Sequence, residues 1–259
     1  MNALVRSILS RLRKIVYVSA RKWLWIVMGA LGLYISLPWL APTLAKAGLV
    51  GPADFVYTIY SPFCHQFAFR SPFLYGEQPF YPRAAAGTAY KPFEAFAIES
   101  PRFLEQYRYW QSVYFGDAAT PTLDDLQAFS VAQQFAARHF IGNERLGYKT
   151  SLCARDLAIY TMMFFGGLVY WRYRWRIRPL PLLVYLLVGL GPIALDGFSQ
   201  LLSYPPFEFW QVRETEPVYR LVTGGLFGLM SAWLAFPHIE RSMDDIAAGI
   251  EATDHPVHE

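Results

Sequence analysis

The sequence has few cysteines and few charged residues. It contains two cysteines among 259 residues, so a disulfide-rich fold is excluded and at most one bridge can form within the chain. Charged residues make up 17% of the chain, below the roughly 25% that is usual in soluble proteins. Hydrophobic residues reach 54% and aromatic residues 17%, and Trp and Tyr gather where membrane proteins meet the lipid headgroups. This composition argues against a soluble domain and favours an integral membrane protein.

The sequence also lacks the short motifs of several enzyme classes. It has no Gly-rich phosphate-binding loop, no G-x-S-x-G nucleophile elbow and no H-E-x-x-H metalloprotease motif. Its densest basic cluster, at 172–178, lies between two apolar segments and therefore does not predict a nucleic-acid partner. No catalytic residue is assigned from the sequence.

Four apolar segments predict an all-α protein with about four transmembrane helices. A helix of about 20 residues crosses the hydrocarbon core of a bilayer. Residues 1–22 carry six basic residues and no acidic one, and four more arginines fill the short loop 172–178. Basic residues favour the cytoplasmic side, so both termini are expected in the cytoplasm. The protein is expected to be a multi-pass protein of the inner or plasma membrane. The predicted spans are 23–42, 153–171, 179–203 and 220–239, with an outer loop at 204–219 and a cytoplasmic tail at 240–259.

The first apolar segment has an alternative interpretation. Ala45-Lys46-Ala47 has the A-x-A form of a signal-peptide cleavage site. The apolar run before it is longer than the 7–15 residues usual in a signal peptide, so a retained transmembrane helix is favoured.

The long segment 43–152 is expected outside the cytoplasm and contains a helical insert at 84–146. Ser100-Pro101 predicts the start of one helix, which Gly116 ends. Thr122 and Asp125 form a capping-box start for another, predicted to continue to Gly142. The aromatic face of the insert is a candidate contact for the lipid bilayer, for a membrane-protein partner or for a second copy of the chain.

Unusual polar residues gather on one side of the predicted bilayer. Charged groups at membrane depth are costly, so they are expected to be paired or to line a wet cavity. One interpretation of Asp196 and Arg220 is a structural ion pair between two helices. The candidate site residues are Cys64, His65, Cys153, Arg155, Asp156, Asp196, Gln200, Arg220 and Thr223.

Three interpretations of the two cysteines remain open. Cys64 and Cys153 can form a disulfide in an oxidising compartment. With His65 and Asp156 they supply donors that suit zinc or another transition metal, although adjacent Cys64 and His65 are awkward ligands together. The third interpretation is redox or nucleophilic thiol chemistry, with His65 or Arg155 lowering a thiol pKa.

Four short motifs resemble those of a known family. Ser61-Pro-Phe-Cys64-His65-Gln66, Leu152-Cys153-Ala154-Arg155, Asp196-Gly197-x-x-Gln200 and Arg220-Leu-x-Thr223-Gly224 are similar to a bacterial membrane-protein family labelled domain of unknown function 2085. The resemblance covers roughly residues 53–75 and 150–236, and it implies a multi-span membrane protein without an assigned activity.

The chain departs from the family pattern at two places. Asp156 stands where a second cysteine of a Cys-Ala-Arg-Cys motif is expected, and a long insert at about 84–146 separates motifs that usually lie close together. A Cys-to-Asp exchange keeps a metal ligand but removes a C-x-x-C thiol pair. The leading hypothesis is therefore an outward-facing metal or small polar ligand site, and the alternatives are an accessory subunit with a Cys64–Cys153 disulfide and a membrane thiol-redox enzyme.

Overall fold

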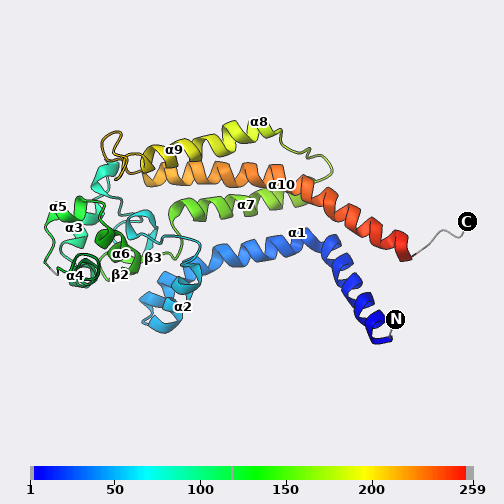
Figure 1. Cartoon of the computed structure of the whole chain (residues 1–259), viewed down its shortest axis with the longest axis horizontal. Coiled ribbons are helices and arrows are strands. Elements are labelled where there is room, and N and C mark those ends of the chain that lie inside the picture. Colours follow the sequence, from blue (N-terminus) through cyan, green and yellow to red (C-terminus); the bar gives the residue numbers. More distant parts are fainter. Residues whose placement is uncertain (1–2, 118, 255–259) are drawn as a thin grey trace, which may run out of the picture.

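The computed structural model describes residues 3–117 and 119–254 and is dominated by helices. Four long helical elements lie side by side, and a smaller folded region sits at one end of them (Figure 1). We call this smaller region, residues 47–153, the head, and the adjoining ends of the long helices the head end. The long elements are α1 (Ala3–Lys46), α7 (Ala154–Tyr173), the consecutive α8 (Leu182–Val184), η3 (Tyr185–Leu190) and α9 (Gly191–Leu201), and α10 (Pro217–Asp254).

Three helical stretches within the described residues are long and apolar enough to cross a membrane. They are Ser7–Lys46, Leu182–Leu201 and Pro217–Thr253. The protein is therefore an all-α membrane protein, as its composition predicted. The predicted span 153–171 corresponds to helix α7, which is not among these three stretches. Its sequence explains the difference, because Arg155, Asp156 and several glycine and tyrosine residues lower its mean hydropathy.

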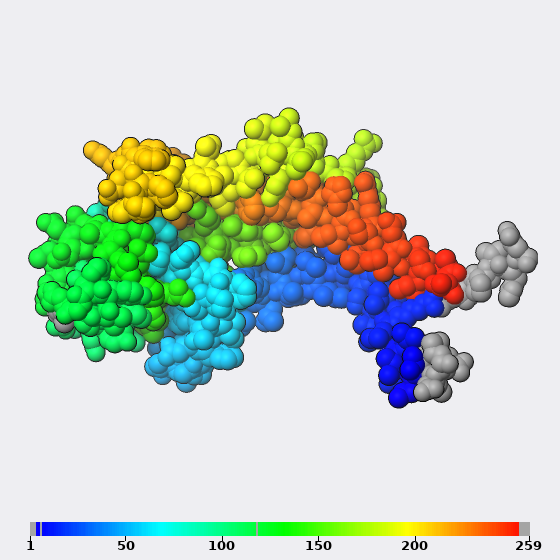
Figure 2. Space-filling view, in the orientation of Figure 1, coloured from blue at the N-terminus to red at the C-terminus, as the bar shows by residue number. Residues whose placement is uncertain are grey.

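Helices α1 and α10 both extend beyond the predicted spans, and their far ends contact one another. The indole of Trp23 donates a hydrogen bond to Glu240 at 2.9 Å, and Arg21 pairs with Glu251 at 2.9 Å. Tyr17 donates to the same Glu251 carboxylate at 2.7 Å. Basic α1 and the acidic part of α10 therefore meet through Arg21 and Glu251, away from the head, where Figure 2 shows the blue and red segments in contact. Residues 255–259 of the predicted tail lie outside the described residues.

Glycines allow α7 and α10 to pack closely. A Cβ atom at Gly228 would lie 2.0 Å from the carbonyl oxygen of Ile159, and one at Gly224 would lie 2.6 Å from that of Arg155. On the α7 side, a Cβ atom at Gly166 would lie 2.9 Å from that of Ala232. Small residues at such contacts let membrane helices approach to backbone distance. This packing fixes the start of α7 against the start of α10, at the head end.

The π-helical segment η3 lies directly before Gly191 and Pro192. Proline has no backbone N–H, so the helix before it loses one regular hydrogen bond. A local π-helical turn is one way in which a helix accommodates such a break. The rod formed by α8, η3 and α9 stays continuous through this point and carries Asp196 and Gln200 to the head end.

The head consists of short helices around a small antiparallel sheet. Strand β3 (Gly147–Lys149) lies between β1 (Phe73–Leu74) and β2 (Gly142–Asn143), with Phe73 opposite Lys149 and Gly142 opposite Tyr148. The sheet therefore holds the segment that contains Cys64 beside the segment that leads into Cys153. The surrounding helices are α2 (Val50–Tyr60), η1 (Ala68–Arg70), η2 (Ala84–Ala86), α3 (Phe93–Ala97), α4 (Pro101–Phe115), α5 (Leu123–Gln127) and α6 (Val131–His139).

The helix predicted from Thr122 to Gly142 is two helices. Thr122 and Asp125 form the expected capping box, but α5 ends at Gln127 and Ala128 is extended. The Ser130 side chain then accepts a hydrogen bond from the backbone N–H of Gln133 and begins α6. The interruption directs Phe129 toward Tyr204, with the two rings stacked 4.0 Å apart. This break therefore joins the head to the loop after α9.

Candidate functional site

The structure brings Cys64, Cys153 and Asp156 together at the start of α7. One ligand atom from each lies within 4.8 Å of the others. Cys153 is the N-cap residue of α7 and Asp156 lies in its first turn, so the Cys153 thiol reaches the Asp156 carboxylate at 3.0 Å. The backbone N–H of Cys153 points to the Cys64 sulfur at 3.3 Å. This is the one group of three or more Cys, His, Asp or Glu ligands that the described part of the chain assembles.

A buried hydrogen-bond clamp fixes the Cys64 segment. The side-chain amide of Gln66 donates to the carbonyl oxygens of Tyr57 and Ser151, at 2.8 and 3.0 Å. The ammonium group of Lys149 donates to the carbonyl oxygen of Gln66 at 2.6 Å. Gln66 itself has a φ of 56°, the left-handed conformation that turns the chain sharply after Cys64. These contacts explain how residues 89 positions apart in the sequence meet.

The protonated form of the Cys64 thiol is favoured. The neighbouring Cys153 side chain raises the pKa of Cys64, and burial raises it further. Cys64 is 7% exposed, so its sulfur has little access to water. A free thiol in this environment is a poor nucleophile, because the thiolate is the reactive form.

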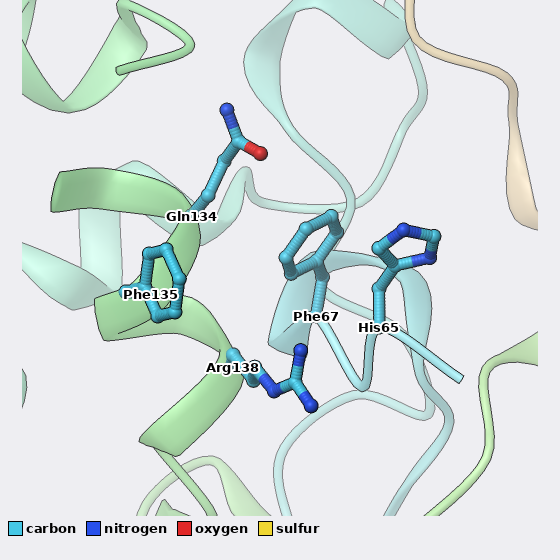
Figure 3. Close-up of a pocket in the computed structure, with 5 residues that line it drawn as sticks. All are labelled: His65, Phe67, Gln134, Phe135 and Arg138. Carbon is cyan, nitrogen blue, oxygen red and sulfur yellow. The ribbon is translucent and has the colours of Figure 1, made fainter. Parts of the chain in front are cut away.

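His65 lies apart from the three grouped residues. Its ring is 5.3 Å from that of Phe67, and it lines a small hollow of about 100 Å³ with Phe67 and Arg138 (Figure 3). Partial burial, together with the charges of Arg70 and Arg138, lowers the pKa of His65. The predicted metal ligand set therefore reduces to Cys64, Cys153 and Asp156, because the His65 ring lies against Phe67 and outside this group.

Asp196 is surrounded by hydrogen-bond donors other than Arg220. Arg155 from α7 pairs with one of its carboxylate oxygens. Arg213 and the Thr215 hydroxyl bind the other oxygen, each at 2.8 Å. The interpretation of Asp196 and Arg220 as a direct ion pair is therefore wrong, because Arg155 and Arg213 pair with the two oxygens of Asp196.

Arg220 instead pairs with Glu214, a residue that the sequence did not single out. Arg220 also donates to the side-chain oxygen of Gln200 at 2.9 Å. Glu214 accepts two hydrogen bonds from Arg70, at 2.9 and 3.1 Å, and one from Tyr204 at 2.6 Å. Its side chain is 1% exposed. Burial opposes its ionisation, but the charges of Arg70 and Arg220 outweigh burial and lower the pKa of Glu214 to about 2.

Thr223 is the remaining residue of the predicted set. Its hydroxyl donates to the carbonyl oxygen of Tyr219 at 2.7 Å, within α10. It lines an open hollow of about 390 Å³ between α9 and α10, together with Asp196, Ser199 and Arg213. Thr223 therefore lies near the charged network and makes its hydrogen bond within its own helix.

A third cavity, of about 280 Å³, lies where the head meets the adjoining ends of the long helices. Three arginines, Arg70, Arg155 and Arg220, line it, and no carboxylate does. The remaining lining residues are His65, Phe67, Phe129, Gln134, Gly197, Gln200, Leu201 and Tyr204. The head, α7, α9 and α10 all contribute lining residues, so the cavity forms only when these elements pack together.

Comparison with known proteins identifies a family for the part of the chain that carries most of these residues. No curated protein and no solved structure shows a significant match to the chain. The matched segment contains Cys153 and Arg220 but not Cys64. Residues 136–234 match the family described as "Predicted membrane protein (DUF2085)", which confirms the family that the motifs resemble.

Proposed function

We propose that this membrane protein binds a thiophilic transition-metal ion, zinc in the first instance, through Cys64, Cys153 and Asp156. The observation that carries the proposal is the convergence of two sulfur atoms and one carboxylate oxygen within 4.8 Å. Zinc is held in proteins by such S and O donors at about 2.0–2.3 Å. Two donors come from the first turn of one helix and the third from a clamped loop, so little rearrangement is needed.

The charge of the surroundings suits an anionic metal centre. Two thiolates, one carboxylate and a divalent ion sum to one negative charge. The Arg70 guanidinium is close enough to Cys153 to interact with it electrostatically. Three protein ligands leave a fourth tetrahedral position, as in catalytic zinc sites, where water or a substrate completes the shell. A metal ion would also hold the head against the start of α7.

A disulfide between Cys64 and Cys153 is the second candidate, and it is favoured by the closeness of the two sulfur atoms. Both cysteines are unbridged in the structure. A bridge would tie the head to α7 covalently and would leave Asp156 as a simple N-terminal helix residue. Metal binding accounts for the Cys153–Asp156 contact as well, and we therefore rank it first.

The test is the metal content of the purified full-length protein. We expect about one zinc or other transition-metal ion per chain, lost in Cys153→Ser and strongly reduced in Asp156→Asn. His65→Ala is the matched control, because His65 neighbours Cys64 in sequence but lies outside the ligand group; it should retain the metal. Thiol alkylation followed by mass spectrometry separates the two candidates. A protein without metal, whose cysteines resist alkylation until they are reduced, would overturn the metal proposal in favour of the disulfide.

A further inference from the structure

The cavity lined by three arginines has features that the metal proposal does not use. Cys64, Cys153 and Asp156 do not line it. Its walls place three guanidinium groups around a space of about 280 Å³, at a level where apolar helices adjoin the head. Arginine presents N–H groups in a planar fork that fits oxygen atoms of carboxylates and phosphates. The cavity is therefore a separate feature with its own ligand chemistry.

Two residues that line this cavity each carry a buried hydrogen-bond donor without a partner. Gln200 is 5% exposed, and its Nε2 atom makes no hydrogen bond; neither does the buried Nε atom of Arg155. The orientation of the Gln200 amide is determined by its neighbours. Its Oε1 accepts from Arg220 and from the Thr215 hydroxyl, so the NH2 group has to be on the opposite side. Buried donors without partners are costly, and a bound acceptor removes that cost.

The charge balance of the network also favours an anion. Arg70, Arg155, Arg213 and Arg220 share two carboxylates, those of Asp196 and Glu214. These six groups leave an excess of two positive charges. Neither carboxylate lines the cavity. An arginine in a weakly hydrated environment attracts an anion more strongly than one in water.

We propose that this cavity binds a small oxyanion, of the class of phosphate, sulfate or a carboxylate. The ligand compensates the excess charge of the arginines, and a small side-chain movement lets it accept hydrogen bonds from the buried donors Gln200 Nε2 and Arg155 Nε. The same chemistry is offered by a free oxyanion and by the phosphate of a lipid headgroup, and the position of the cavity near the apolar helices makes both accessible. The two sites share no proposed ligand residue, although Arg70 lines the cavity and also interacts electrostatically with Cys153.

Thermal unfolding of the full-length protein in detergent tests the proposal. Inorganic phosphate should raise the midpoint temperature in a saturable way, beyond the effect of sodium chloride at equal ionic strength, because a ligand of the folded state stabilises it. Equilibrium dialysis with labelled phosphate should then give about one phosphate per chain. Short-chain phosphatidic acid forms the second arm. If it stabilises the protein and inorganic phosphate does not, the ligand is a lipid headgroup bound by the same donors.

Two arginine variants separate the cavity from the ion-pair network. Arg155→Gln and Arg213→Gln each remove one partner of Asp196, but only Arg155 lines the cavity. We expect Arg155→Gln to weaken phosphate binding at least tenfold and Arg213→Gln to change it less than threefold. Gln200→Glu is a further variant of unchanged size, and it should abolish binding because it replaces the free donor with a carboxylate.

Two results would overturn the proposal. One is the absence of stabilisation and of dialysis binding with both phosphate and phosphatidic acid. The other is unchanged binding in both Arg155→Gln and Gln200→Glu. Metal content is measured on the same samples. Phosphate binding without metal would support the oxyanion site and contradict the metal proposal. Metal binding without phosphate would support the metal proposal and contradict the oxyanion site.

Discussion

Glu214 is the residue on which the charged network depends. It is buried and receives hydrogen bonds from the head, through Arg70, and from α10, through Arg220. The Tyr204 hydroxyl supplies a further hydrogen bond. A buried carboxylate with several donors is stable, but removal of its charge leaves the half-buried Arg70 and the buried Arg220 without their ion-pair partner. Glu214 therefore links the head to the membrane helices.

Replacement of Glu214 by Gln should destabilise the protein by about 3–5 kcal/mol, the usual cost of breaking a buried ion pair. Denaturant or thermal unfolding in detergent measures the change. Glu144→Gln is the control, because Glu144 pairs with Lys46 in an exposed position, where the side chain of Glu144 is 74% exposed. Exposed pairs contribute about 0–1 kcal/mol, so this control should have little effect. Similar stability of the two variants would contradict the role assigned to Glu214.

The same carboxylate predicts an acid dependence. The pKa of Glu214 is lowered to about 2 from an ordinary value of 4.5, so its ionised form stabilises the folded state. This contribution is complete above about pH 4.5 and is lost as the pH falls from 4.5 toward 2. At about 1.4 kcal/mol per pH unit the loss is roughly 3 kcal/mol. Unfolding measured from pH 6 to pH 3 should show a steeper decline in the wild type than in Glu214→Gln, and parallel curves would argue against this origin.

Individual elements differ in how far the sequence specifies them. Helix α4 begins after Ser100 and ends before Gly116, as predicted, because both signals act on the backbone next to them. The break at Ala128 was not predictable in the same way, since the apolar spacing continues across it and the stacking of Phe129 on Tyr204 is a tertiary contact.

The candidate site shows the same limit. The charges and span lengths predicted that Cys64, Cys153, Asp196 and Arg220 lie at one end of the helices. They did not predict which groups pair, because Glu214 differs from an ordinary loop carboxylate only through its burial. Arg70 lies within the segment that the Cys64 motif singled out, and that proximity was the one available signal for it.

The packing of α7 on α10 gives a prediction at the scale of the helix. Gly228→Ala would place a methyl group 2.0 Å from the Ile159 carbonyl oxygen, so the helices would have to separate. Overpacking of this kind usually costs about 1–3 kcal/mol. Gly29→Ala in α1 is the matched control, because its Cβ meets nothing within 4 Å and alanine favours helices by about 1 kcal/mol. Thermal unfolding should separate the two variants by several degrees, and equal midpoints would mean that α7 and α10 pack differently.

The arrangement of the whole molecule bears on how often the chain crosses the membrane. By length and composition, three helical stretches can cross a membrane. An odd number of crossings would put the two ends of the chain on opposite sides of the membrane. However, α1 and α10 meet through Trp23 and Glu240 and through Arg21 and Glu251, far from the head. These contacts predict that both ends lie on the same side. An even number of crossings needs one more span, and we expect it to be α7, which with 20 residues is about 30 Å long and can reach across the hydrocarbon core.

Labelling of single added cysteines with a membrane-impermeant maleimide tests this topology. We expect Ser112→Cys in α4 to react in intact cells, because α4 belongs to the head and the head is expected outside the cytoplasm. Ser10→Cys in α1, Arg176→Cys after α7 and Gly249→Cys in α10 should react only after permeabilisation, because basic residues concentrate at that end. The unmodified chain, whose Cys64 is buried, gives the background. Labelling of Ser10→Cys and Gly249→Cys from opposite sides would mean that α7 does not cross, and the contacts between the ends of α1 and α10 could not then form.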